Sequence, residues 1–254
     1  MSKRQNRRAE ALVVNGNNQS SFKSNNTVVM DSYRKVPQQR PINLLPKSLT
    51  QETYIDLLTD PSKLIVFATG PAGTGKTMLA VLAALKAFRA GSIERIVVTR
   101  PAVGVDDEEH GFLPGDLNEK MAPWTRPIFD IIGEYYRQSE IARMLDENQI
   151  EISPLAYMRG RTFKNSWIIA DEMQNATPSQ MKMLLTRLGE GSKMIVTGDT
   201  RQADRSDDNN GLLDFQHLVE DYKKCKFVSG VEFEHRDIQR HPAVLEILKI
   251  YKEV

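Results

Sequence analysis

The chain has 254 residues, of which 40% are hydrophobic and 26% are charged, enough for one substantial core and too few for two large domains. No apolar run approaches the roughly 18 residues of a membrane span, and the N-terminus lacks the apolar core of a secretory signal. The single cysteine, Cys225, excludes an internal disulfide framework and a cysteine-built zinc site. We therefore expect a cytoplasmic protein without a membrane segment.

The net charge of +1 is unevenly distributed. Residues 1–46 carry eight basic residues against Glu10 and Asp31, a net charge of +6. Residues 1–40 are also poor in apolar side chains, so they cannot offset the entropy cost of ordering. We predict a flexible basic N-terminal arm and linker over residues 1–47 and a single folded domain over 48–254. A basic arm is compatible with nucleic-acid contact; a solvated tail explains it equally well.

Short apolar runs alternate with helical patterns along the rest of the chain. A helix is expected over Thr77–Ala90, closed by Gly91, and a second from the capping box at Thr177 to Gly189. A last helix begins at Pro242. This alternation predicts an α/β fold, with a mostly parallel sheet flanked by helices on both faces. The expected strands are Leu64–Ala68, Ile96–Thr99, Trp167–Ala170, Met194–Thr197 and Phe227–Ser229.

A phosphate-binding loop follows the first expected strand and opens the first long helix. It fits the G-x-x-x-x-G-K-[ST] pattern at every specified position. The glycines let the backbone wrap around phosphates, and the backbone N–H groups at the helix N-terminus face the anion. Lys76 is expected to reach the β- and γ-phosphates and Thr77 to hold Mg²⁺. The loop consists of Gly70, Pro71, Ala72, Gly73, Thr74, Gly75, Lys76 and Thr77.

An acidic pair, Asp171 and Glu172, ends the expected strand Trp167–Ala170. Carboxylates at the carboxyl end of a buried strand face the crevice where open α/β sheets bind ligands. Asp171 suits a metal role, and Glu172 suits the base that deprotonates water. The added glutamate favours hydrolysis over transfer to another acceptor. Polar residues 197–202 come at the end of the next strand. They could contact the γ-phosphate or its attacking water, or they could simply form a turn.

These motifs and several others resemble the PhoH-like (phosphate-starvation-inducible) ATPase family, whose core is similar to the first motor domain of superfamily-one helicases. The resemblance runs from about residue 48 to the C-terminus and implies a RecA-like P-loop NTPase fold. Besides the loop and the acidic pair, the matching stretches are Thr99–Val103, Gly111–Leu117, Leu155–Thr162, Gln174–Asn175, Gln180–Met183, Leu185–Gly189, Gly191–Met194, Thr197–Asp199 with Gln202, and Asp237–His241. Val105–His110 departs from the family by being more acidic, which argues against nucleic-acid contact there.

The resemblance implies three further roles. Gln51 is expected near the adenine, and Gln202 is expected to sense the γ-phosphate. Arg240 is a candidate arginine finger, because the transition-state charge of phosphoryl transfer is commonly met by an arginine. Since the chain has no room for a second motor domain, we expect Arg240, or Arg236 beside it, to reach an adjacent subunit of a homo-oligomeric ring, most simply a hexamer. The alternative is a surface arginine beside the final helix.

The sequence therefore predicts an ATP- and Mg²⁺-dependent ATPase, helicase-like in chemistry, that works on RNA or DNA, with single-stranded nucleic acid as the expected partner. Two other classes stay open: an oligomeric ATP-dependent interaction module or switch without motor activity, and a small-molecule kinase with residues 104–165 as its lid. The turn arginines Arg159 and Arg161 fit a nucleic-acid contact, a subunit contact or neither. We predict no nuclease activity.

Overall fold

The computed structural model describes residues 40–101, 117–201 and 210–251. Its centre is a six-stranded sheet in which all paired strands are parallel, in the order β3-β2-β4-β5-β1-β6. This confirms the predicted α/β class and its RecA-like arrangement, with β5 inserted between the loop-bearing strand and the strand of the acidic pair. The strands are β1 (Ile65–Thr69), β2 (Arg95–Thr99), β3 (Ile150–Ile152), β4 (Ser166–Ala170), β5 (Lys193–Gly198) and β6 (Val228–Glu232).

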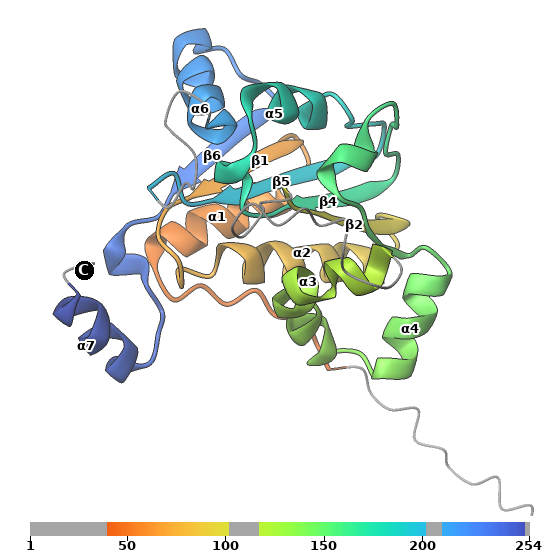
Figure 1. The fold of residues 1–254 in the computed structure, drawn as a ribbon, viewed down its shortest axis with the longest axis horizontal. Helices are drawn as coiled ribbons and strands as arrows, with labels where there is room; N and C mark the ends of the chain where they lie inside the picture. The colour runs from red at the N-terminus through yellow and green to blue at the C-terminus, as the bar shows by residue number, and fades with distance from the viewer. Residues whose placement is uncertain (1–39, 102–116, 202–209, 252–254) are drawn as a thin grey trace, which may run out of the picture. The chain divides into compact units, whose positions relative to one another are not determined.

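Helices cover both faces of the sheet, as predicted (Figure 1). One face packs against α1 (Leu49–Thr59), α2 (Lys76–Arg89), α3 (Leu117–Gly133) and α4 (Gln138–Asp146). The other packs against α5 (Pro178–Leu185), α6 (Gly211–Tyr222) and the short 3-10 helices η2 (Leu155–Met158) and η3 (Met173–Asn175). The chain continues through η5 (His235–Asp237) to α7 (Pro242–Ile250), which begins at the predicted proline.

Central strands bury side chains on both faces because each face carries its own apolar core. Ile169 of β4 points into the core beneath α1–α4, whereas its neighbour Ile168 points into the core beneath α5 and α6. The near-continuous apolar runs of the sequence are therefore the ones expected for strands covered on both sides. Ile42, in the segment predicted as a linker, is also buried in the first core, so packing begins before Leu49.

The predicted helix from Thr177 to Gly189 is shorter in the structure. Helix α5 starts after the Thr177 capping box but ends at Leu185 rather than at Gly189. Phe163 supplies the reason: its N–H donates to the Arg187 carbonyl at 3.0 Å, and its carbonyl accepts from the Gly189 N–H at 2.8 Å. Backbone groups engaged in this extended pairing are not free to continue a helix.

A buried lysine joins the sheet to the end of α1. Lys193, the first residue of β5, donates from Nζ to the carbonyls of Leu57 (2.7 Å), Leu58 (2.6 Å) and Asp60 (2.9 Å). These carbonyls lie at the C-terminal end of α1, where orphan acceptors need donors. Desolvation lowers the pKa of Lys193 to about 8, against the attraction of Asp60.

This pKa predicts a pH-dependent stability. Between pH 8 and 10.5 the folded chain releases the Lys193 proton while the unfolded chain keeps it. The free energy of unfolding should therefore rise with pH in this window, by up to about 1.4 kcal/mol per pH unit. Lys193→Met should lack that contribution. Denaturant unfolding of the native protein and of Lys193→Met from pH 7.5 to 10.5 tests the prediction. A difference in the free energy of unfolding that stays constant with pH contradicts it.

Candidate active site

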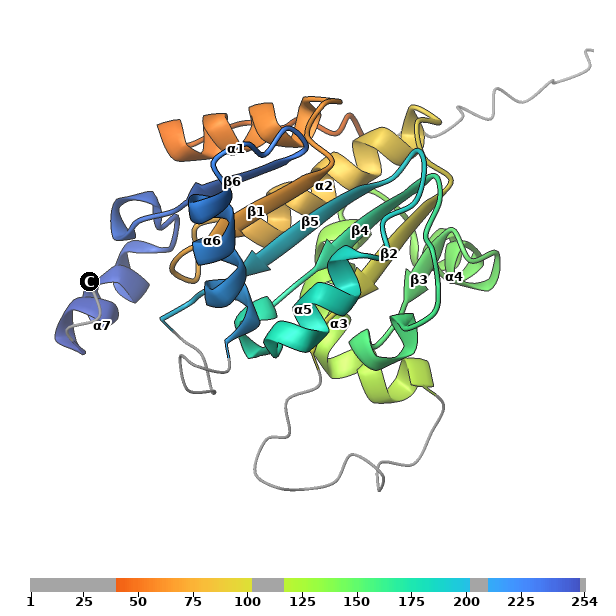
Figure 2. The same cartoon turned by 90° about the horizontal axis from the view of Figure 1, so that it is seen from above.

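The strand order brings three loops to one edge of the sheet. β5 lies between β1 and β4, with Thr69 opposite Gly198 and Ala170 opposite Val196 (Figure 2). Because all three strands are parallel, the residues that follow them emerge side by side at their carboxyl ends. The phosphate-binding loop, the acidic pair and Asp199 therefore line one cavity of about 250 Å³.

The loop adopts a conformation that requires its glycines. Gly73 and Gly75 have φ angles of +82° and +85°, in the left-handed region that other residues rarely enter. Helix α2 begins directly afterwards at Lys76. Its first backbone N–H groups have no partners within the helix, so they are available to an anion.

Lys76 is a desolvated cation inside this loop. Its side chain is buried, and Nζ donates to the carbonyls of Gly70 (2.6 Å) and Pro71 (2.7 Å). Desolvation lowers the pKa of Lys76, while the nearby carboxylates Asp199, Glu172 and Asp171 act in the opposite direction. A buried ammonium in a glycine-rich loop is suited to binding a phosphate. The phosphate would compensate the positive charge, which the loop carbonyls do only in part.

The two predicted metal residues are in direct contact. The Thr77 hydroxyl donates to Asp171 Oδ1 at 2.8 Å, and the hydroxyl of Thr197 donates to the same oxygen at 2.5 Å. A hydroxyl that donates its proton to a carboxylate keeps its lone pairs free, so Thr77 can accept a cation at the same time. The hydrogen bond from Thr197 was not predicted, because it depends on β5 lying beside β4.

Glu172 is held in an unusual backbone conformation. Its φ angle is 53°, left-handed for a residue that is not glycine, at the start of η3. Such conformations cost on the order of 1–3 kcal/mol and concentrate at functional sites. The Glu172 carboxylate lines the same cavity as Lys76 and Thr77, as expected of a group that acts on water beside the phosphates.

Gln51, on α1, forms a hydrogen bond with the phosphate-binding loop. It is buried on α1, and its Nε2 donates to the Thr74 carbonyl at 2.9 Å while its Oε1 accepts from the Lys47 N–H at 2.7 Å. The side-chain amide is thus engaged with the backbone on both sides. Its expected contact with adenine stays a prediction.

Arg240 lies against the loop of its own chain. The neighbouring Gln239 N–H donates to the Gly73 carbonyl at 2.9 Å. The Arg240 side chain then crosses Gly73 so closely that a Cβ there would come within 2.9 Å of the arginine Cγ. The segment is fixed further by Asp237, whose carboxylate accepts from the Glu234 N–H at 2.9 Å. Gln202 and the acidic stretch 105–110 lie outside the described residues.

The two turn arginines differ in their surroundings. Arg161 pairs with Glu151, with 2.5 Å between Nη1 and Oε1, and its guanidinium lies 4.5 Å from the centre of the Phe163 ring. Arg159 is exposed. Arg161 is therefore held in a fixed position by Glu151 although its side chain is 38% exposed, whereas Arg159 is on the surface.

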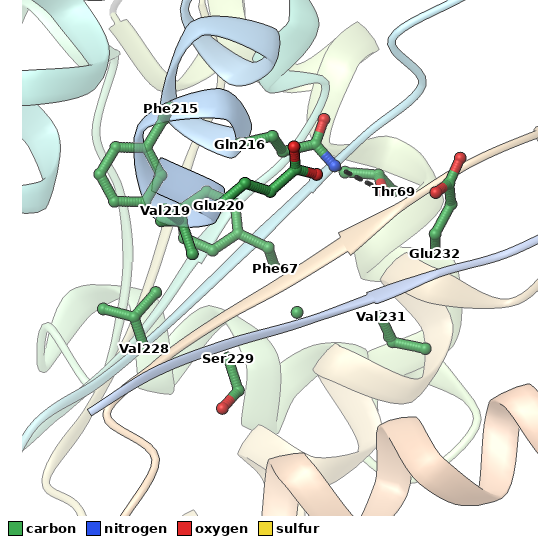
Figure 3. A pocket seen from close by; sticks show the side chains of 11 residues that line it. Phe67, Thr69, Phe215, Gln216, Val219, Glu220, Val228, Ser229, Val231 and Glu232 are labelled. Atoms are coloured by element: carbon green, nitrogen blue, oxygen red, sulfur yellow. Dashed lines mark hydrogen bonds between the residues drawn. The ribbon is translucent and has the colours of Figure 1, made fainter. Parts of the chain in front are cut away.

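A second cavity, of about 270 Å³, lies between α6 and β6 (Figure 3). Its lining includes the stacked rings of Phe67 and Phe215, and Gln216, which donates to the Thr69 hydroxyl (Figure 3). The charged side chains that line it are the carboxylates Glu220 and Glu232. Since these would repel a phosphate, this cavity is not a second nucleotide-phosphate site.

No helix within 40–101, 117–201 and 210–251 is long and apolar enough to cross a membrane. The same residues contain no group of three or more His, Cys, Asp or Glu side chains placed to hold a metal ion. Thr77 and Asp171, which are in contact, could hold Mg²⁺ together with phosphate oxygens of a ligand, because Mg²⁺ is usually bound through one or two carboxylates and substrate phosphates.

The parallel sheet, the phosphate-binding loop after β1 and the acidic pair after β4 define a P-loop NTPase fold. The chain belongs to the PhoH-like protein family, whose sequence profile matches residues 43–252.

Relatives of known sequence agree with this assignment. The PhoH-like protein of Bacillus subtilis (strain 168) is 44% identical over 206 residues, 81% of this chain and 63% of that protein. Protein PhoH of Escherichia coli (strain K12) is 42% identical over 211 residues, 82% of this chain and 58% of that protein. The chain thus spans about three-fifths of the length of these relatives.

Among solved structures, the chain is similar to the Pif1 helicase from Candida albicans, with a TM-score of 0.41 and 16% identity over 82% of this chain and 44% of that one. It is also similar to the Sulfolobus solfataricus SWI2/SNF2 ATPase core in complex with dsDNA, with a TM-score of 0.41 and 11% identity over 77% and 47% of the two chains.

Proposed function

We propose that this protein binds ATP and hydrolyses it with Mg²⁺. The observation that carries the proposal is the convergence of Lys76, the Thr77–Asp171 pair and Glu172 on one cavity at the carboxyl edge of the sheet. A cation, a hydroxyl–carboxylate pair and a second carboxylate are the three groups that positioning, metal binding and water activation require in phosphoryl transfer.

Each group has a separate task in the proposed reaction. The N–H groups at the start of α2 and Lys76 hold the β- and γ-phosphates, and Thr77 with Asp171 holds Mg²⁺, which would neutralise charge on the phosphate oxygens. Glu172 accepts a proton from water as the water oxygen bonds to the γ-phosphorus. The bond from that phosphorus to the β–γ bridging oxygen breaks, and ADP and phosphate leave. Glu172 favours water as the acceptor over the hydroxyl of a kinase substrate.

We further propose that hydrolysis is coupled to work on RNA or single-stranded DNA. The support is the net charge of +6 on residues 1–46 and the family resemblance to helicase motors. The alternative is an oligomeric interaction module that uses ATP as a switch. Single-stranded RNA or DNA should raise the ATPase rate, with an affinity that falls steeply as salt increases. An ATPase rate that neither RNA nor DNA changes, together with ATP-dependent assembly of the protein, would favour the switch.

The site is shared between subunits if Arg240 acts on the nucleotide of a neighbouring subunit, and it is contained in one chain if Arg240 acts on its own. The expected arginine finger acts on a neighbour in a ring of six, yet Arg240 rests on Gly73 of its own chain in this structure. Arg240→Ala should abolish turnover and spare ATP binding under either arrangement. Mixing Arg240→Ala with Lys76→Ala separates the two. A finger that acts on a neighbour restores turnover in mixed rings, because an intact loop then meets an intact arginine.

If Arg240 acts within its own chain, the mixture stays inactive at every ratio. Arg236→Ala provides the comparison, since Arg236 is also exposed and pairs with Glu234 at 3.1 Å. Native mass with and without a non-hydrolysable ATP analogue reports the subunit number independently of turnover.

A further inference from the structure

A glutamine bridges the proposed base to the loop after β5. Gln174 is buried on η3, and its Nε2 donates to Glu172 Oε2 at 2.6 Å. The other end of the same amide, Oε1, accepts from the backbone N–H of Asp199 at 3.1 Å. One side chain therefore ties the Glu172 carboxylate to Asp199, two residues that line the phosphate cavity from different strands.

The bridge is built into the packing around it. Gly198 leaves room for it, because a Cβ at that position would come within 2.6 Å of Gln174 Oε1. A side-chain amide is the group that can satisfy both partners, since it donates at one end and accepts at the other. A carboxylate at position 174 would lack the donor, and an apolar side chain would lack both functions.

Glu172 needs such a restraint. Its backbone is already in the left-handed region, and its side chain is only partly buried, so packing alone does not fix its rotamer. Of the hydrogen bonds described for this carboxylate, the one from Gln174 fixes where Oε2 points. Misplacing a catalytic group by about 1 Å can cost on the order of 100-fold in rate.

We propose that Gln174 is the positioning residue for Glu172, and that it links the orientation of the base to the position of Asp199, the residue that follows β5. This inference rests on the proposed function, because it assigns Gln174 a role only if Glu172 acts on water. Gln174 itself touches neither phosphate nor water. Ligand-induced movement of Asp199 would be passed to Glu172 through the amide.

The test is Gln174→Met, which keeps the length of the side chain and removes both hydrogen bonds. We expect kcat for ATP to fall by about 30- to 100-fold, with the affinity for a non-hydrolysable ATP analogue within about twofold of the native value. A circular dichroism melt establishes that the variant is folded. Gln149→Met is the matched control: Gln149 donates to Glu147 Oε2 at 2.9 Å, also two residues away, on the surface far from the cavity.

A double-mutant cycle separates positioning from general loosening of the fold. In a Glu172→Gln background the second change, Gln174→Met, should cost less than about threefold, because the group that it orients is already inactive. A structural defect would add its full effect in both backgrounds. Gln174→Glu gives an independent readout. Its rate relative to the native protein should recover as pH falls, since a protonated Glu at 174 regains a donor, whereas Gln174→Met cannot recover.

The outcomes distinguish this inference from the proposed function. If the native protein shows no Mg²⁺-dependent hydrolysis, both the proposed function and this inference are wrong. If the native protein hydrolyses ATP and Gln174→Met keeps its kcat, or loses analogue binding in parallel with kcat, Gln174 is not the positioning residue and the proposed function stands.

Discussion

Replacing Lys76 by methionine should abolish ATP hydrolysis, by about 1,000-fold or more, while the ligand-free protein stays folded. The loss follows because a methionine cannot compensate the γ-phosphate charge. Two contributions to the stability of the variant oppose each other. Methionine removes a charge whose desolvation lowers the pKa of Lys76, but it leaves the carbonyls of Gly70 and Pro71 without the donor that Nζ supplies. Phosphate release measures the loss of hydrolysis, and urea unfolding measures the stability.

The contribution of the buried charge can be isolated through its pH dependence. A lysine whose folded pKa lies below its unfolded value of 10.5 destabilises the fold below the folded pKa, and this penalty disappears as pH rises past 10.5. The stability of Lys76→Met relative to the native protein should therefore be highest at neutral pH and fall as pH rises towards 10.5. Lys86→Met is the matched control, because Lys86 is exposed on the same helix. Turnover by Lys76→Met close to the native rate would refute the assignment of this loop.

Sequence patterns located the strands because both faces of the sheet are covered. A strand such as Trp167–Ala170 is then an uninterrupted apolar run, which stands out from its surroundings. β3 escaped prediction because it has three residues with Glu151 at its centre, too short and too polar to form such a run. The end of α5 was misplaced because contacts with Phe163, distant in sequence, interrupt the helix.

The site divides in the same way. The loop and the acidic pair are local patterns, so they were predictable from spacing and from their position after strands. The hydrogen bonds of Thr197 and Gln174 were not, because they depend on β5 lying between β1 and β4. The chain order of the strands does not reveal that insertion. The position of Arg240 on Gly73 likewise depends on the path of the chain after β6.

Replacing Glu172 by glutamine should lower kcat by about 100- to 10,000-fold while ATP and Mg²⁺ still bind. The amide has the shape of the carboxylate but cannot accept the proton of the attacking water. Its oxygen can still receive the hydrogen bond that Gln174 now donates at 2.6 Å, so the geometry should persist. Asp171→Asn should differ, because Asp171 accepts from Thr77 at the proposed metal position. That variant should lose the Mg²⁺ dependence of nucleotide affinity as well as turnover.

This contrast tests the division of labour between two adjacent carboxylates. Binding of a fluorescent ATP analogue, titrated with Mg²⁺, should separate Glu172→Gln from Asp171→Asn, and single-turnover phosphate release should show both as inactive. Glu147→Gln is the control, since Glu147 also accepts from a glutamine two residues away but lies on the surface. Hydrolysis by Glu172→Gln within about tenfold of the native rate would mean that another group deprotonates the water. The left-handed backbone at Glu172 would then need a different explanation.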